Sequence, residues 1–483
     1  MRPPSIAIIG AGFSGSLLAL HLSGHHAPAT RIQLIEQAPE FGRGLAYSTS
    51  CSDHILNVPA GRMSAFHDRP LHFLDWLNRQ PDDVHNARTP DSGAFVRRRL
   101  YGDYVKELLA DAARTAPPGR LELVRGEVIA ITRDPEGLTL HFSGGRSSSC
   151  AIAVLATGHN IPADPCPAMR GKRFYQPDPW DFHGIEDALP PDRAVLLIGT
   201  GLTMTDTVLR LLAHGHQGPI HAISRRGLLP RTHAVLPTPA PIFDPAAFPR
   251  QPRALLRFVR REAERIAEAG YPWHAVIDAL RPITQDIWRG WPAAERRRFL
   301  THVRPWWDVH RHRMANSIAS RIEVARASGQ LRIHAGRIAG FVTRSDAVDI
   351  AWRPRGAATA ESLRVHRVIN CTGPDTDVAK ASDPLTRSLL LGGLGRPDTH
   401  CLGFDVTGEG ALRGCASDRL FGVGPICRGA LWEITAVPEI RAQCQALARH
   451  IAALSRQPET LDWPPVHPPS PPAAAPKISG FWF

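Results

Sequence analysis

Ser5-Ile6-Ala7-Ile8-Ile9-Gly10-Ala11-Gly12-Phe13-Ser14-Gly15-Ser16 is the stretch that decides the fold of this chain. Its first half is a short apolar run, typical of a buried strand, and its second half carries the pattern G-x-G-x-x-G. A leucine-rich run typical of a helix follows through residue 22. The glycines suit a tight turn, a close approach of pyrophosphate to the backbone, and close packing of helix on strand. The stretch therefore indicates dinucleotide binding at a helix N-terminus.

A second apolar run supports this interpretation. Residues 31–35 are typical of a strand and end at Glu36, 21 residues after Gly15, where a carboxylate can bind ribose hydroxyls. A glycine turn in an ordinary α/β unit would account for the glycines but not for this acid. The predicted cofactor contacts of the unit are Gly10, Gly12, Phe13, Ser14, Gly15 and Glu36.

A second fingerprint follows the apolar run at residues 194–198. It reads Gly199-Thr200-Gly201-Leu202-Thr203-Met204, with methionine in the place of the third glycine. The next strand-like run ends in Arg225-Arg226, which suits the 2′-phosphate of NADPH; a surface pair in an arginine-rich protein is the alternative. The acid in the first unit, Glu36, and the arginine pair in the second predict FAD on the first unit and NADPH on the second. The predicted contacts of the second unit are Gly199, Gly201, Leu202, Thr203, Ser224, Arg225 and Arg226.

Several loops are predicted to complete the cofactor sites. Two strand-like runs enter Ala156-Thr157-Gly158 and Asn370-Cys371-Thr372-Gly373, which we interpret as joins that return the chain to the first domain. Residues 41–47 are predicted to form a glycine-rich loop that carries one arginine. Residues 54–66 are predicted to line the flavin as an extended loop, although a packed connecting loop explains them equally well. After Gly424 we expect a helix N-terminus at the flavin pyrimidine edge, in a helix that runs through residue 452. The further predicted cofactor contacts are Arg43, Gly44, Asn57, Val58, Met63, Ser64, Arg99, Val128, Thr157, Gly158, Cys371, Thr372, Gly373, Gly424, Pro425 and Trp432.

The expected fold class is α/β, with two Rossmann-like three-layer dinucleotide-binding domains, for FAD and for NADPH, and a helical insertion in the second. A chain of 483 residues is too long for one core. Among the expected strands are separate ones at 331–335, 338–343 and 365–369. The predicted parts are the FAD-binding domain at 1–160 and 369–456, a linker at 161–192, the NADPH-binding domain at 193–368 with its insertion at 235–325, and a proline-rich tail at 457–483.

The insertion ends in Arg304-Pro305-Trp306-Trp307-Asp308-Val309-His310-Arg311-His312-Arg313. On a helix Asp308 and His312 share one face, as do Trp307 and Arg311. Such groups suit a substrate or nicotinamide pocket, and the alternative is an ion-paired helix that packs on a nucleotide domain. In the first case an arginine would stabilise negative charge on reacting oxygen, oriented by Asp308. The predicted catalytic residues are Arg304, Asp308, Arg311 and Trp432.

Composition limits the remaining classes of function. Hydrophobic residues make up 43% and charged residues 21%, which are globular values. The net charge of +12 reflects arginine, since only four of 57 basic residues are lysine, and we predict no nucleic-acid partner. No apolar run or leader suggests a membrane or export, so we expect a cytoplasmic protein. The eight cysteines lack C-x-x-C and metal spacing, which argues against zinc and against a flavin-linked dithiol.

A family resemblance rests on IAIIGAGFSGSLLALHL, HILNVPAGRMSAF, FVRRRLYGDYV, the two joins, PWWDVHRHR and GALWEITAVPEIR. Together these resemble the FAD/NAD(P)-binding protein family, bacterial flavoproteins akin to class B flavin monooxygenases. The resemblance implies bound FAD, reduction by NAD(P)H and a fold with two dinucleotide-binding domains. The linker carries a degenerate form of the Baeyer–Villiger motif F-x-G-x-x-x-H-x-x-x-W, with Met169, Gly171, Tyr175 and Trp180 but without its histidine.

The cofactors predict a monooxygenase that consumes NADPH and O2 and acts on a small molecule through a C4a-(hydro)peroxyflavin. Baeyer–Villiger oxidation and oxygenation of nitrogen or sulfur both remain open. The alternatives are a flavin-dependent reductase or dehydrogenase that inserts no oxygen, and a non-catalytic sensor of redox state or NADPH. The sequence leaves the substrate and the oligomeric state open.

Overall fold

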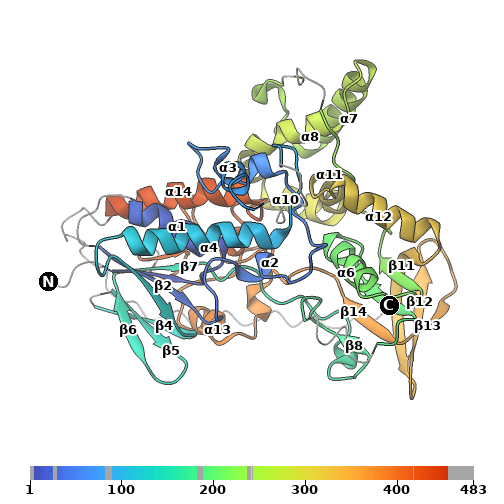
Figure 1. The fold of residues 1–483 in the computed structure, drawn as a ribbon, viewed down its shortest axis with the longest axis horizontal. Coiled ribbons are helices and arrows are strands. Elements are labelled where there is room, and N and C mark those ends of the chain that lie inside the picture. Colours follow the sequence, from blue (N-terminus) through green and yellow to red (C-terminus); the bar gives the residue numbers. More distant parts are fainter. Residues whose placement is uncertain are drawn as a thin grey trace.

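The computed structural model describes residues 5–24, 30–81, 90–135, 137–181, 189–236, 241, 243–416 and 418–454. The predicted tail at 457–483 lies outside these residues. Two lobes, each built on its own sheet, lie side by side, and a group of helices projects beside their junction (Figure 1). Among the described residues, no helix has the length and apolar character needed to cross a membrane.

The first lobe contains a parallel sheet in the order β15-β7-β1-β2-β3. Its strands are β1 (Ser5–Ile9), β2 (Arg31–Glu36), β3 (Leu121–Arg125), β7 (Ile152–Leu155) and β15 (Leu420–Gly422). The helices α1 (Phe13–Gly24), α4 (Arg98–Thr115) and α14 (Val437–Leu454) pack together on one side of it (Figure 1). On the other side lie α13 (Pro384–Leu391) and an antiparallel sheet of β4 (Val128–Asp134), β5 (Gly137–Phe142) and β6 (Ser147–Cys150). Buried residues from both ends of the chain form one core, because β15 and α14 complete the lobe that β1 begins.

The second lobe contains a sheet in the order β13-β12-β11-β10-β9-β14-β8. Its strands are β8 (Tyr175–Gln176), β9 (Val195–Ile198), β10 (Ile220–Ser224), β11 (Leu331–Thr343), β12 (Val348–Pro354), β13 (Glu361–Val365) and β14 (Arg367–Asn370). The helices α6 (Leu202–Ala213) and α12 (Asn316–Ala327) pack against each other beside it. The predicted α/β class with two dinucleotide-binding domains is confirmed.

Two predictions of strand boundaries were wrong. The strands expected at 331–335 and 338–343 are one strand, β11. Its first part pairs with β10, and from Gly336 onward it pairs with β12, with a register shift between Ile338 and Gly340 inside the second pairing. The strand expected at 365–369 divides into β13 and β14, which pair with different neighbours. The linker expected at 161–192 supplies β8, whose pairing with β14 extends the second sheet.

The insertion after β10 is helical, as its sequence predicts. It contains α7 (Pro252–Glu268), α8 (His274–Leu280), α9 (Thr284–Gly290), α10 (Ala293–Arg298), a π-helical turn (Phe299–Val303) and α11 (Arg304–Arg311). These helices share a core of their own, to which Leu402 and Trp432 of the first lobe also belong. The remaining short elements are α2 (Gly44–Tyr47), α3 (His72–Leu77) and 3-10 turns at Ala60–Arg62, Pro167–Met169, Pro245–Ala247, Arg281–Ile283, Val378–Lys380 and Pro425–Cys427.

The segment after Gly424 differs from its prediction. The helix expected to begin there starts at Val437, so that α14 is preceded by the 3-10 turn and by the buried turns of residues 428–436. Glu433 has a φ of 68°, which no residue of a right-handed helix adopts, and Pro438 is tolerated only in a first helical turn. Residues 428–436, which we call the C-terminal turn segment, therefore contribute buried side chains instead of a helix N-terminus.

Candidate functional site

The first fingerprint loop requires its glycines. Gly10 has a φ of 100°, and a Cβ atom there would lie 2.5 Å from the carbonyl oxygen of Ala156. A Cβ atom on Gly15 would lie 1.9 Å from the carbonyl oxygen of Gly10, so that α1 packs directly on the turn after β1. These close approaches follow from the parallel pairing of β1 with β7, which brings Ala156 beside the loop.

The second fingerprint repeats the same relationship. Gly199 has a φ of 120°, and a Cβ atom there would lie 2.3 Å from the carbonyl oxygen of Cys371. Ala156 and Cys371 each precede a Thr-Gly pair, so both predicted joins meet the first glycine of a fingerprint. Cβ atoms on Gly158, Gly201 and Gly373 would meet no protein atom within 4 Å, which leaves open space beside both loops.

Other predicted contacts converge on the first loop. A Cβ atom on Gly424, whose φ is 79°, would lie 2.6 Å from the Ser14 hydroxyl, and one on Gly12 would lie 3.3 Å from the Cα of Gly44. Glu36 accepts the backbone N–H of Ala11 at 2.7 Å. Gly424 and Pro425 thus lie at the start of α1, although they are more than 400 residues away in sequence. The residues around this loop fit a bound dinucleotide.

The predicted arginine pair lies beside the second loop. Thr200 donates its hydroxyl to the carbonyl oxygen of Leu228 at 2.6 Å, and its Oγ1 lies 2.8 Å from Ser224 Oγ. The turn between them carries Arg225, which is exposed, and Arg226, which is half-buried. Leu202 and Thr203 begin α6 directly after the second fingerprint loop. Arg225 and Arg226 therefore belong to a turn that is hydrogen-bonded to this loop.

Some predicted cofactor contacts have side chains that are engaged elsewhere. Arg43 pairs with Asp103 and Glu40, and the Ser64 hydroxyl bonds the carbonyl oxygens of Phe66 and Arg69. The Cys371 thiol lies in the second core, 3.5 Å from the hydroxyl of Thr207. The side chains of Phe13, Val58, Met63 and Val128 belong to the first core. Backbone contacts remain open to these residues, and their cofactor roles stay predictions.

Of the three arginines at the start of α4, the structure turns inward a different one from the predicted Arg99. Arg99, the predicted contact, is exposed. Its neighbour Arg98 extends inward and pairs with Asp206 of α6 at 2.8 Å, with both side chains largely buried. The pair ties the two lobes together. A second contact between them joins the carbonyl oxygen of Asn57 to Nε2 of His233 at 3.0 Å. A helix presents three adjacent residues in three directions, so the run alone did not distinguish them.

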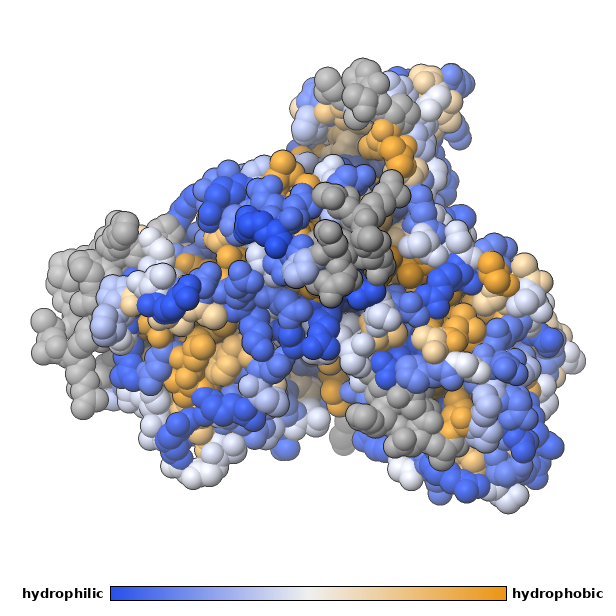
Figure 2. Space-filling model, in the orientation of Figure 1, coloured by the Kyte–Doolittle hydropathy of each residue, from blue (hydrophilic) through white to orange (hydrophobic). Residues whose placement is uncertain are grey.

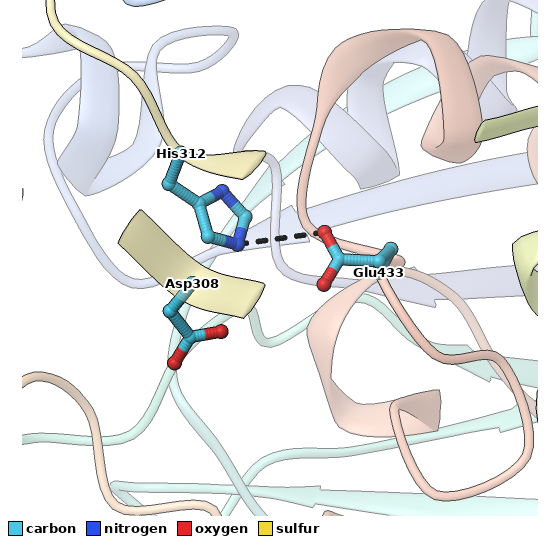
Figure 3. Close-up of side chains that lie close together, drawn as sticks. All are labelled: Asp308, His312 and Glu433. Carbon is cyan, nitrogen blue, oxygen red and sulfur yellow. Dashed lines mark ion pairs between the residues drawn. The ribbon is translucent and has the colours of Figure 1, made fainter. Parts of the chain in front are cut away.

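The end of the insertion meets the C-terminal turn segment at Glu433, which is 3% exposed. Trp307 donates its indole N–H to Glu433 Oε1 at 2.8 Å, while Arg311 and His312 lie 3.5 and 3.4 Å from Oε2. Figure 3 shows the His312 ring at the end of α11 pointing toward this carboxylate, with Asp308 on the same helix below it. His312 and Arg311 hold the pKa of Glu433 far below its usual value despite burial, which acts in the opposite direction.

Asp308, His312 and Glu433 offer ligand atoms within 4.8 Å of one another. The cluster is nevertheless part of an ion-pair network, because Arg311 already pairs with Glu433. Arg311 also pairs with Glu439, which accepts two further bonds from Arg281. These charges disfavour a bound cation.

The predicted catalytic residues fall into three environments. Arg304 and Asp308 form a half-exposed pair at 3.3 Å. Arg311 is 8% exposed and is shared by Glu433 and Glu439, an environment that fits the ion-paired helix of the alternative interpretation. The catalytic roles of these three residues stay predictions. Trp432 is 2% exposed and stacks on Trp288 with ring centroids 4.8 Å apart.

Sequence reasoning missed Glu433, Glu439 and Arg428. Arg428 is 9% exposed, its Nε lacks a hydrogen-bond partner among the described residues, and its guanidinium lies 4.5 Å from the Trp432 ring centroid. A signal for Glu433 was present, because a carboxylate between Trp432 and Ile434 in an apolar run has to find partners when buried. The sequence carried no signal for which partners those are.

These features define a flavoprotein with two dinucleotide-binding domains, and the comparisons agree with this class. Residues 7–160 match the model of a family described as FAD-NAD(P)-binding. No curated protein matches the sequence significantly.

Solved structures similar to this one include three amine monooxygenases. The cadaverine monooxygenase of desferrioxamine biosynthesis from Erwinia amylovora has a TM-score of 0.66 at 13% identity, over 97% of this chain and 100% of its own. The ornithine N-hydroxylase from Kutzneria sp. 744 has a TM-score of 0.64 at 14% identity, over 94% and 99%. The ornithine hydroxylase from Pseudomonas aeruginosa has 0.64 at 14%, over 93% and 99%. At this identity the similarity shows the fold.

Proposed function

We propose that this protein is an FAD-dependent, NADPH-consuming monooxygenase that transfers one oxygen atom to the nitrogen of an amine. The observation that carries the proposal is the pair of fingerprint loops, each closed by a Thr-Gly join, on a fold shared end to end with amine monooxygenases. The acid at Glu36 and the arginines at 225 and 226 support FAD on the first loop and NADPH on the second.

Bound FAD, once reduced by NADPH, supplies the activation of O2. The chain has to hold the cofactors, exclude water and orient charge. The turn at Gly10, the start of α1 and Gly424 surround the first site, and α6 opens the second. The buried stack of Trp288 and Trp432 excludes water from one side of the C-terminal turn segment. Arg304, oriented by Asp308, places positive charge at the exposed end of α11.

Two rival reactions have weaker support. A dithiol reductase needs reactive thiols, but burial raises the pKa of Cys427 to about 12 and raises that of Cys444 well above its usual range. A Baeyer–Villiger enzyme of the usual type would carry a histidine in the linker motif. The corresponding stretch contains Met169 and Tyr175, both buried in the second lobe.

The test is oxygen consumption by the FAD-loaded protein with NADPH, measured with and without candidate amines. We expect consumption that depends on the amine and a stoichiometric yield of hydroxylamine. NADPH oxidation with dyes or quinones as acceptors, but without amine-dependent oxygen consumption, would establish a reductase instead. Oxygenation of ketones, with amines inert, would establish the Baeyer–Villiger reaction.

A further inference from the structure

The helical insertion encloses a cavity of about 320 Å³, at the small end of the range for small-molecule sites. Residues of α7, α8, α9 and α11 line it, together with Trp432 from the first lobe. Figure 2 shows apolar residues on the projecting group of helices that contains α7 and α8. The lining includes six tryptophans, namely Trp273, Trp288, Trp291, Trp306, Trp307 and Trp432.

Few charges reach this cavity. Among the described residues that line it, Arg260 and His310 are basic and none carries a carboxylate. A diammonium ligand would therefore lose water without gaining a counter-ion, which is a large penalty in an apolar site. An uncharged ligand with an aromatic body would instead pack against indole rings, which favour offset and edge-to-face contacts.

The cavity is connected to the first nucleotide site through one segment of chain. Trp432 forms part of the cavity wall, and the same C-terminal turn segment follows directly on Gly424 and Pro425 beside Ser14. Trp288 fixes that segment, since it stacks on Trp432 and donates its indole N–H to the carbonyl oxygen of Gly429 at 2.8 Å. A ligand in the cavity would therefore contact Trp432, eight residues along the chain from Gly424 at the first fingerprint loop.

We infer that the substrate is a primary amine on an apolar, aromatic body, bound in this cavity as the neutral free base; the inference rests on the proposed function. Burial of an amine in apolar surroundings lowers its pKa and so exposes the nitrogen lone pair that attacks oxygen. In the reaction an N–O bond forms and the O–O bond of O2 breaks. One N–H bond of the amine also breaks, and the second oxygen atom leaves as water. NADPH supplies two electrons as a hydride and becomes NADP+, one proton is taken up, and the amine becomes a hydroxylamine.

The experiment compares tryptamine and phenethylamine with cadaverine, ornithine and octylamine on the FAD-loaded protein. Binding is measured by equilibrium dialysis, and turnover by hydroxylamine formation with NADPH and O2. We expect the two aromatic amines to bind and to have kcat/KM values roughly 100-fold above that of cadaverine. Preference for cadaverine or ornithine would overturn the inference and leave N-oxygenation intact. Preference for octylamine would overturn the aromatic part.

Three variants on α7 test whether the amine binds in this cavity. Leu256→Glu places a carboxylate in the cavity wall, and we expect it to lower tryptamine affinity at least tenfold and to improve cadaverine binding. Ala267→Glu makes the same charge change on the exposed face of the same helix and should change neither. Ala263→Phe, which fills the cavity without a charge, should weaken tryptamine binding as well. Equal effects of Leu256→Glu and Ala267→Glu would overturn the assignment.

The two proposals fail in different ways. If tryptamine binds with dependence on Leu256 but no amine is oxygenated, the proposed N-oxygenation is wrong and the cavity assignment stands. If amines are oxygenated while no cavity variant changes their binding or preference, the cavity assignment is wrong and the proposed function stands. Thermal unfolding of each variant shows whether a loss of binding reflects a loss of folding.

Discussion

Trp307 and Glu433 are joined by a hydrogen bond of 2.8 Å that links the helical insertion of the second lobe to the C-terminal turn segment of the first. The bond holds the carboxylate of a residue that is 3% exposed. The backbone of Glu433 has a φ of 68°, a conformation that costs about 1 to 3 kcal/mol in a non-glycine residue. Arg311 and His312 lie 3.5 and 3.4 Å from the same carboxylate. The shape of the segment beside Gly424 therefore depends on helices of the other lobe.

The first prediction concerns this carboxylate. Glu433→Gln keeps an acceptor for Trp307 but leaves Arg311 without one of its two counter-charges, and we expect a loss of about 2 to 4 kcal/mol in the free energy of unfolding. Urea denaturation measures it. Asp308→Asn breaks a half-exposed ion pair with Arg304 and is the control, expected to cost less than about 1 kcal/mol. Equal losses would contradict the network.

A second prediction concerns the first fingerprint. Gly15→Ala places a Cβ atom 1.9 Å from the carbonyl oxygen of Gly10, so we expect the turn to be displaced and the purified protein to lose most of its FAD. The flavin absorbance per protein reports the loss. Gly24→Ala, at the other end of α1, meets no atom within 4 Å and should retain full flavin content. Normal flavin content in Gly15→Ala would refute the packing argument.

The third prediction addresses the choice of nicotinamide coenzyme. Replacing Arg225 and Arg226 together by glutamine removes the guanidinium groups proposed for the 2′-phosphate, and we expect the KM for NADPH to rise roughly 10- to 100-fold, equivalent to about 1.4 to 2.7 kcal/mol. The KM for NADH should change little. Arg332→Gln, an exposed arginine on β11, is the matched control. If the wild-type protein already uses NADH as well as NADPH, the interpretation of the pair is wrong.

A fourth prediction is the response of stability to acid. Burial, aided by His334 and Arg332, lowers the pKa of His221 to about 4, and its Nδ1 lies 3.0 Å from Nε2 of His334. An unfolded histidine binds its proton near pH 6.5, so unfolding takes up a proton between these values and stability falls as the pH falls. The contribution lost between pH 7 and pH 5 is about 2 kcal/mol.

The measurement is the free energy of unfolding of wild type and His221→Asn at pH 7 and at pH 5. The variant should lose less stability than wild type over this interval. His67→Asn alters an exposed histidine and provides the comparison. If His221→Asn loses as much stability between pH 7 and pH 5 as wild type does, the histidine pair is not the source of the acid sensitivity.

The sequence predicted the two nucleotide-binding units because their signals are local. A strand, a glycine turn and a helix N-terminus occupy fewer than twenty consecutive residues, and the turn geometry at Gly10 and Gly199 admits essentially no other residue. Both Thr-Gly joins were also recognisable, since each follows a buried strand directly. The family resemblance added the pairing of FAD with NAD(P)H, which the fold is consistent with.

Tertiary structure alone decided the candidate catalytic region. Glu433 meets Trp307 across 126 positions of sequence, and Arg98, not Arg99, pairs with Asp206 of α6. The cavity arises from the faces of four helices and one distant tryptophan, whose directions no sequence period specifies. Local backbone geometry is determined by neighbouring residues. The partner of a buried charge and the shape of a cavity depend instead on which distant surfaces the folded chain brings together.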